Sequence, residues 1–167
     1  MLKYAWPGAL AIVFLCLLSS SVSALDVGRT APGFKLADQF GKVWDLSALK
    51  GSVVVVVAAD RDSGRGMDPW MQGLKAKYGG KIVLLGLLDL RGVPGIGRGI
   101  ARAKIRGETS DPLMLDFGGD VADAYMVNPK NPTVVVIGKS QVVKAVAKSA
   151  YSESGFASIA SAIDSAL

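Results

Sequence analysis

The chain has 167 residues, half of them hydrophobic, with 19 Lys and Arg against 14 Asp and Glu, one cysteine and no histidine. The length suits one domain, and the absence of histidine excludes His-dependent triads, His-ligated zinc sites and imidazole acid–base chemistry. The net charge of +5 is mild, and neither a Lys/Arg run nor interleaved aromatic residues accompany it, so nucleic-acid binding is disfavoured.

The first 24 residues have the pattern of a secretory signal peptide. Lys3 precedes an apolar run over 9–18, and small residues occupy 22–24. The run is shorter than the about 20 residues of a spanning helix, which favours cleavage after Ala24 over an uncleaved membrane anchor. Cys16 lacks the small residue that normally precedes a lipid-attachment cysteine. We therefore predict an exported, periplasmic domain of residues 25–167 that contacts the membrane only through the signal peptide before cleavage.

Strand-like and helix-like patterns alternate along this domain, which predicts an α/β fold with a central mixed β-sheet flanked by helices. The β-branched run 53–59 and the apolar run 82–88 are predicted to be buried strands. Between them, Asp68-Pro69 is the expected start of a helix and Gly79-Gly80 its end, with Met71 on the buried face. This βαβ order implies that the two strands pair in parallel.

The remaining predicted elements are shorter. In chain order they are a strand at 43–46, a glycine-rich turn at 92–99, a helix at 100–106, a strand at 113–115, a helical turn at 121–125, two strands at 134–137 and 142–146, and a closing helix at 153–167. The last two strands flank the turn 138–140 and are expected to form a hairpin. The closing helix places Phe156, Ile159, Ala160 and Ile163 on one face.

Several short segments are weak signals alone but specific in their order and spacing. They are Gly28–Asp38, Gly41-Lys42, Leu46–Gly51, Pro112–Asp116, Val121–Tyr125 and Asn131-Pro132-Thr133. Over residues 27–166 the chain thereby resembles the thioredoxin-like superfamily, in its redoxin branch of thiol peroxidases and periplasmic thiol-disulfide proteins. The resemblance implies a thioredoxin-like fold with an N-terminal redoxin-type extension. It also implies a cis bond before Pro132, beside the redox site, with a trans proline that opens an edge strand as the alternative.

The resemblance places the redox site directly after the valine strand, where the superfamily has a Cys-x-x-Cys pair or a peroxidatic cysteine. This chain has Asp60-Arg61-Asp62-Ser63-Gly64-Arg65 there, and an ungapped match puts Arg61 and Gly64 at the two cysteine positions. Because no cysteine follows residue 24, we expect neither thiol peroxidase nor disulfide reductase activity. An assignment as a thiol-disulfide oxidoreductase or antioxidant would rest on the fold only, because the residues that this activity needs are missing.

Residues 88–97 are similar to a segment of the YtfJ family of exported bacterial proteins, thioredoxin-fold members that lack the redox cysteines. This resemblance implies a periplasmic, cysteine-less redoxin domain. It carries over no catalytic residue.

The candidate binding site is the former redox position and the proline turn beside it: Asp60, Arg61, Asp62, Ser63, Gly64, Arg65, Asn131 and Pro132. Two guanidinium groups near a helix start would suit the carboxylate or phosphate of a periplasmic protein or a small anionic ligand. The alternative is a solvated loop in which Asp60 and Asp62 form salt bridges with the two arginines.

Two cofactor motifs are incomplete. A calcium loop that starts at Asp60 fails because Arg65 and Met71 stand where glycine and glutamate are needed. Gly95-x-Gly97-x-Gly99 has its third glycine one residue early for a dinucleotide fingerprint. We therefore expect neither a metal nor a cofactor.

Arg98, Arg102 and Arg106 recur every four residues and form a cationic stripe on a predicted helix whose other face carries Ala101 and Ile105. Such a stripe is typically solvated. The alternative is a docking surface for an acidic partner or an anionic lipid.

Three functions are compatible with these residues. The first, which we favour by analogy at the level of the fold, is a non-catalytic binding module that uses the former redox face. The second is a cell-envelope accessory or structural protein that docks through the arginine stripe. The third is an enzyme with non-thiol chemistry, for which the chain offers no recognisable base.

Overall fold

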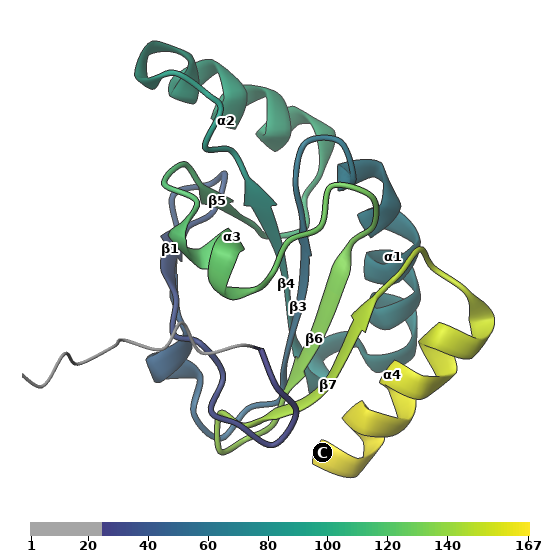
Figure 1. Cartoon of the computed structure of the whole chain (residues 1–167). Helices are drawn as coiled ribbons and strands as arrows, with labels where there is room; N and C mark the ends of the chain where they lie inside the picture. Colours follow the sequence, from purple (N-terminus) through teal and green to yellow (C-terminus); the bar gives the residue numbers. More distant parts are fainter. Residues whose placement is uncertain (1–24) are drawn as a thin grey trace, which may run out of the picture.

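The computed structural model of the protein describes residues 25–167, so the predicted signal peptide lies outside the described residues. The helices and strands are, in chain order, β1 (Lys35–Ala37), β2 (Val43–Asp45), β3 (Val54–Ala59), α1 (Met67–Tyr78), β4 (Val83–Asp89), α2 (Arg98–Glu108), β5 (Leu113–Asp116), α3 (Asp120–Ala124), β6 (Thr133–Ile137), β7 (Val143–Lys148) and α4 (Glu153–Ala166) (Figure 1). Short 3₁₀ turns occupy 46–49, 64–66, 79–81 and 95–97. None of the described helices combines the length and the apolarity needed to cross a bilayer.

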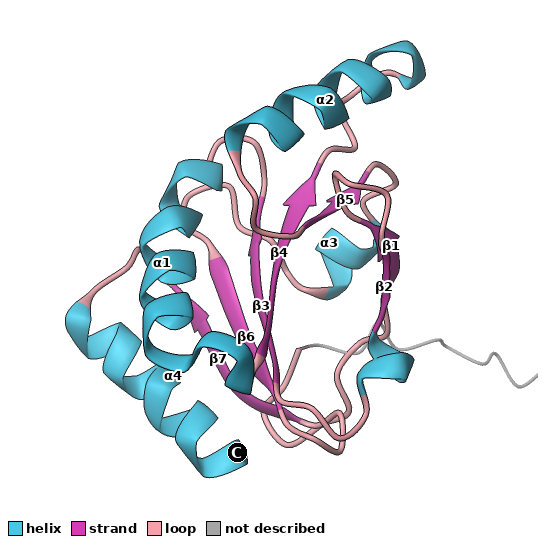
Figure 2. Ribbon diagram, turned by 180° about the vertical axis from the view of Figure 1, so that it is seen from behind, coloured by secondary structure: helices cyan, strands magenta, loops and turns pink. Residues whose placement is uncertain are grey.

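A five-stranded mixed sheet forms the centre of the domain. Its strand order is β5-β4-β3-β6-β7, with β3, β4 and β5 parallel and β6 antiparallel to both of its neighbours. Strands β1 and β2 form a separate antiparallel pair in the N-terminal part of the chain, and a single bridge from Asp38 to Met114 joins it to β5. Figure 2 shows α1 and α4 on one face of the central sheet and α3 on the other. The predicted mixed α/β architecture is therefore confirmed.

Strand β3 lies at the centre of this sheet because every residue of it can be buried. Val55 and Val57 pack toward α1 and α4, while Val54 and Val56 belong to the cluster on the opposite face. A strand that is apolar on both faces needs a cover on each, which the helices and the N-terminal segment supply.

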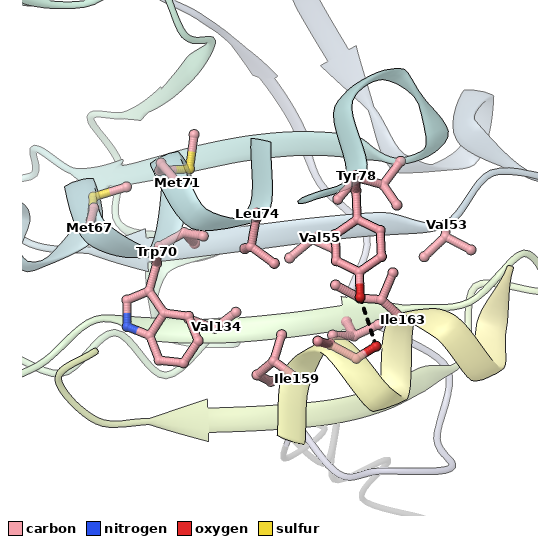
Figure 3. Packing of buried hydrophobic residues seen from close by; sticks show 14 of the residues in the cluster. Val53, Val55, Met67, Trp70, Met71, Leu74, Tyr78, Val134, Ile159 and Ile163 are labelled. Atoms are coloured by element: carbon pink, nitrogen blue, oxygen red, sulfur yellow. Dashed lines mark hydrogen bonds between the residues drawn. The ribbon is translucent and has the colours of Figure 1, made fainter. Parts of the chain in front are cut away.

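The sheet face under α1 and α4 is packed around Trp70 and Tyr78. Trp70 and Leu74 of α1 and Ile163 of α4 are fully buried there (Figure 3). The Tyr78 hydroxyl donates a hydrogen bond of 2.9 Å to the carbonyl of Ala160, which ties the two helices together. On the other face, the hydroxyl of buried Tyr125 donates to the Pro32 carbonyl at 2.9 Å, and burial raises the pKa of this tyrosine above its usual range.

Most predicted elements agree with the structure to within two residues, which is the usual scatter of helix and strand ends. The hairpin of β6 and β7 is confirmed. The predicted N-cap is wrong, because α1 begins at Met67 and the cap position is Gly66, with Asp68 inside the first turn. The pattern analysis also missed β1, which is only three residues long and too short to show alternation.

Candidate functional site

The candidate site lies at the edge of the sheet where β3 and β4 end. These strands are parallel and β6 runs antiparallel to β3, with Ala58 opposite Thr133. The loop that follows β3 and the turn that precedes β6 must therefore meet at this edge. Open crevices at the carboxyl ends of parallel strands are the usual ligand sites of α/β folds.

Asp60 and Ser63 close the loop on itself. The Asp60 carboxylate accepts hydrogen bonds from the Ser63 hydroxyl at 2.7 Å, the Ser63 amide at 2.8 Å and the Asp62 amide at 3.0 Å. The Asp60 amide in turn donates to the Ser63 oxygen at 3.1 Å. Burial alone would raise the pKa of Asp60, but the bonds from Ser63 and Asp62 outweigh it and hold this pKa below its usual range.

Gly66 brings the loop against Pro132. A Cβ atom at this glycine would lie 3.0 Å from both Cγ and Cδ of the proline ring. Any side chain here would push the start of α1 away from the turn. The structure thus places the residue after the Asp60–Arg65 loop in direct contact with the proline turn.

The bond before Pro132 is trans, as is every peptide bond in residues 25–167, so the predicted cis bond is wrong. Pro132 is buried and immediately precedes Thr133, the first residue of β6. A proline in this position takes no ladder hydrogen bond away from the strand, so a trans proline fits although β6 is central.

Arg61 and Arg65 are both exposed on this loop. Within the described part of the chain neither guanidinium group forms an ion pair or a side-chain hydrogen bond. The salt-bridged loop considered above is therefore not what forms, because Asp60 is turned onto Ser63 and Asp62 is exposed without an arginine partner. The loop presents two cationic side chains to solvent.

The turn before β6 brings Asn131, which the sequence analysis assigns to the site, and a bend at Met126 that it does not predict. Asn131 is half-buried, and Met126 adopts a left-handed φ of 51°. The carbonyl of Met126 accepts a hydrogen bond from Thr133 at 3.2 Å, and its sulfur lies 3.3 Å from the Lys148 ammonium. Nothing in the sequence signals a positive φ at methionine, so this bend is not predictable from residue type.

Arg91 fixes the neighbouring loop, which follows β4. Its guanidinium group donates to Asp89 at 2.8 Å and to Asp123 of α3 at 2.5 Å, and it also reaches the Gly119 carbonyl at 3.1 Å. The hydrogen bond from Arg91 lowers the pKa of Asp123. The Asp89-Arg91 spacing could have suggested a local ion pair. The ion pair with Asp123, which is 32 residues away, could not be predicted from the sequence.

The arginine stripe lies on α2, beyond the same end of the sheet (Figures 1 and 2). Arg98 stacks over Phe117 with its guanidinium carbon 5.2 Å from the ring centre. Arg102 and Arg106 are exposed and have no ion pair among residues 25–167. Ala101 and Ile105 face inward but stay half-buried.

The described residues contain no group of three or more His, Cys, Asp or Glu side chains placed to hold a metal ion. Of the two acidic residues in the Asp60–Arg65 loop, Asp60 is committed to local hydrogen bonds, and Asp62 is exposed.

No family profile matches the chain, and no curated protein matches it. Solved structures do. A candidate protein disulfide isomerase from Bacteroides thetaiotaomicron is 25% identical with a TM-score of 0.64, over 86% of this chain and 91% of that one. A candidate thiol:disulfide interchange protein DsbE from Chlorobium tepidum is 23% identical with a TM-score of 0.66, over 86% and 99%.

A third similar structure is the exposed lipoprotein thioredoxin Etrx1 of Streptococcus pneumoniae, 19% identical with a TM-score of 0.63, over 80% of this chain and 99% of that one. These likenesses cover nearly the whole described domain. The chain therefore has a thioredoxin-like fold of the kind found in thiol-disulfide oxidoreductases.

Proposed function

We propose that this protein is an exported thioredoxin-fold module without thiol chemistry, which binds a carboxylate- or phosphate-bearing ligand at the Asp60–Arg65 loop. The ligand is either a small anion or an acidic segment of a protein. The observation that carries the proposal is the division of charge in the loop. Asp60 is turned inward onto Ser63, while Arg61 and Arg65 are exposed without partners in the described domain.

The residues at the former redox position support binding rather than thiol chemistry. Two of the similar solved structures are described as a disulfide isomerase and a thiol:disulfide interchange protein. Disulfide exchange requires a thiolate nucleophile. Here Arg61 and Gly64 occupy the matching positions, and the one cysteine of the chain is Cys16, inside the predicted signal peptide. The loop therefore occupies the position of the redox pair but has no thiol that could exchange disulfides.

A non-thiol enzyme is less well supported. Ser63 is the one hydroxyl in the loop, and it is only 5% exposed. Its oxygen accepts from the Asp60 amide while its proton goes to the Asp60 carboxylate, so the hydroxyl is committed to the loop. An activated serine needs an accessible oxygen and an effective base. The Ser63 oxygen is buried, and the lowered pKa of Asp60 makes its carboxylate a weak base.

Three observations support export. Residues 1–24 have the signal-peptide pattern, residues 88–97 are similar to the YtfJ family of exported proteins, and the similar Streptococcus pneumoniae protein is described as an exposed lipoprotein. We propose that the chain is a periplasmic, cysteine-less redoxin domain of the YtfJ type.

The proposal is tested by nuclear magnetic resonance titration of the full chain with inorganic phosphate and, separately, with a short polyglutamate peptide. We expect saturable shifts in the amides of 60–66 and in the guanidinium signals of Arg61 and Arg65. The R61Q/R65Q variant should bind about tenfold or more weakly, because each charge-assisted hydrogen bond contributes about 1.5–3 kcal/mol.

The matched control is K50Q/K81Q, which removes two exposed charges that precede β3 and β4 at the opposite end of the sheet. Tighter binding of phosphate would identify a small anion, and tighter binding of the peptide would identify an acidic protein segment. Unchanged affinity in R61Q/R65Q, or shifts that do not saturate in the loop, would overturn the proposal.

A further inference from the structure

Helix α2 and the turn before it carry an apolar strip on their outward face. Ile96 is 96% exposed and Ile100 is 75% exposed, the two most exposed large hydrophobic side chains in the described domain. Ile96 lies in the 3₁₀ turn that leads into α2, and helical spacing places Ala103 and Gly107 along the same side of α2 as Ile100. This strip is distinct from the inward pair Ala101 and Ile105.

Basic residues border this strip. From Leu90 to Gly107 the chain has five Lys and Arg residues and no Asp or Glu. At 100° per residue, Lys104 lies on one side of the strip and Arg106 on the other, with Arg102 beyond it. Lys104 pairs with Glu108, the last residue of α2, at 3.9 Å. Arg102 and Arg106 form no ion pair with any described residue, so their charge is available to an external partner.

The position of α2 leaves the strip accessible. Both ribbon views show the helix beyond the end of the sheet rather than over one of its faces (Figures 1 and 2). None of its residues is fully buried. The outward face can therefore approach a broad surface without first displacing a part of the domain.

We propose that α2 and the turn 95–97 dock the protein on an anionic phospholipid surface. Ile96 and Ile100 enter the boundary between headgroups and acyl chains, and the flanking cations meet the lipid phosphates. Charge complementarity favours this occupant: a narrow apolar strip between basic flanks is the pattern of helices that lie in a bilayer interface. The inference is independent of the ligand site at Asp60–Arg65.

The test is hydrogen–deuterium exchange of the full chain with two kinds of vesicle, pure phosphatidylcholine and phosphatidylcholine with about 30% phosphatidylglycerol. We expect exchange over 96–108 to slow by about tenfold or more on the anionic vesicles alone. A readout at α2 reports docking there even if the N-terminal segment also meets the vesicle.

Two variants locate the contact. I96S/I100S removes the apolar strip and R102E/R106E reverses two charges, and each should abolish most of the added protection. One lost cation alone weakens attraction to such a surface about fivefold. The controls are V27S/V43S, which alters exposed apolar residues elsewhere, and K50E/K81E, which reverses charges at the far end of the sheet.

Equal protection on neutral vesicles would overturn the proposal, as would protection that survives in R102E/R106E. Absence of protection on the anionic vesicles would also overturn it and would leave an acidic protein as the partner that fits α2.

Discussion

Helices α1 and α2 follow neighbouring parallel strands and leave the sheet at the same edge, yet they are held in opposite ways. Five residues of α1 are buried against the sheet and α4: Met67, Trp70, Met71, Leu74 and Tyr78. No residue of α2 is fully buried. The comparison shows that one βαβ pattern can supply both a core helix that holds a site in place and an outlying helix whose surface is free for a partner.

The two loops that lead into these helices differ in the same way. In the loop before α1, Asp60 and Ser63 hydrogen-bond to each other, and the start of the helix contacts Pro132. The loop before α2 ends in a glycine-rich 3₁₀ turn that exposes Ile96. The site loop is held by its own hydrogen bonds and by contact with Pro132, whereas α2, none of whose residues is fully buried, depends mainly on its own backbone hydrogen bonds.

The largest expected effect separates the two helices directly. Leu74→Ala should lower the free energy of unfolding by about 2–5 kcal/mol, because it opens a cavity in the core. Ile105→Ala in α2 should cost about 1 kcal/mol or less, since the side chain is only half-buried. Urea denaturation of both variants measures the difference, and equal losses would show that α2 belongs to the core.

Asp60→Ala should cost about 1–2 kcal/mol. The substitution leaves the buried Ser63 hydroxyl and the amides of Ser63 and Asp62 without their acceptor. Asp62→Ala is the matched control, and it should stay within about 0.5 kcal/mol because Asp62 is exposed. If both variants unfold at the same urea concentration, the closed loop contributes nothing to stability.

A smaller effect follows from the lowered pKa of Asp60. The folded-state pKa lies below the unfolded value, so the stabilisation is present above the unfolded pKa of about 4 and is lost as pH falls through the folded pKa. Asp60→Asn should therefore be less stable than wild type near neutral pH, and the gap should narrow in acid. Denaturation curves across this pH range test it, and a gap that widens in acid would contradict the assignment.

Sequence reasoning could predict the elements that are defined by their own residues. The valine strand β3 and the inner face of α1 are examples, because buried apolar side chains recur there with a clear period. The hairpin of β6 and β7 was predictable from its turn.

The features that sequence reasoning missed depend on competition between alternative hydrogen-bond partners or on contacts with residues far away in the sequence. Asp60 could pair with an arginine or with its own loop, and the local hydrogen bonds prevail because they need no long side chain to be ordered. The trans bond before Pro132 and the link from Arg91 to Asp123 depend on tertiary context. The exposure of α2 also lay beyond the sequence, since Ala101 and Ile105 looked like an ordinary inner face.

The central claim is that the Asp60–Arg65 loop, rather than basic charge in general, binds an anionic ligand. The most direct measurement compares the affinity of the polyglutamate peptide for the wild type, R61E/R65E and R102E/R106E by titration calorimetry. The two variants change net charge equally. We predict a loss of about tenfold or more in R61E/R65E and less than about twofold in R102E/R106E. An equal loss in both variants, or a loss in R102E/R106E alone, would contradict the claim.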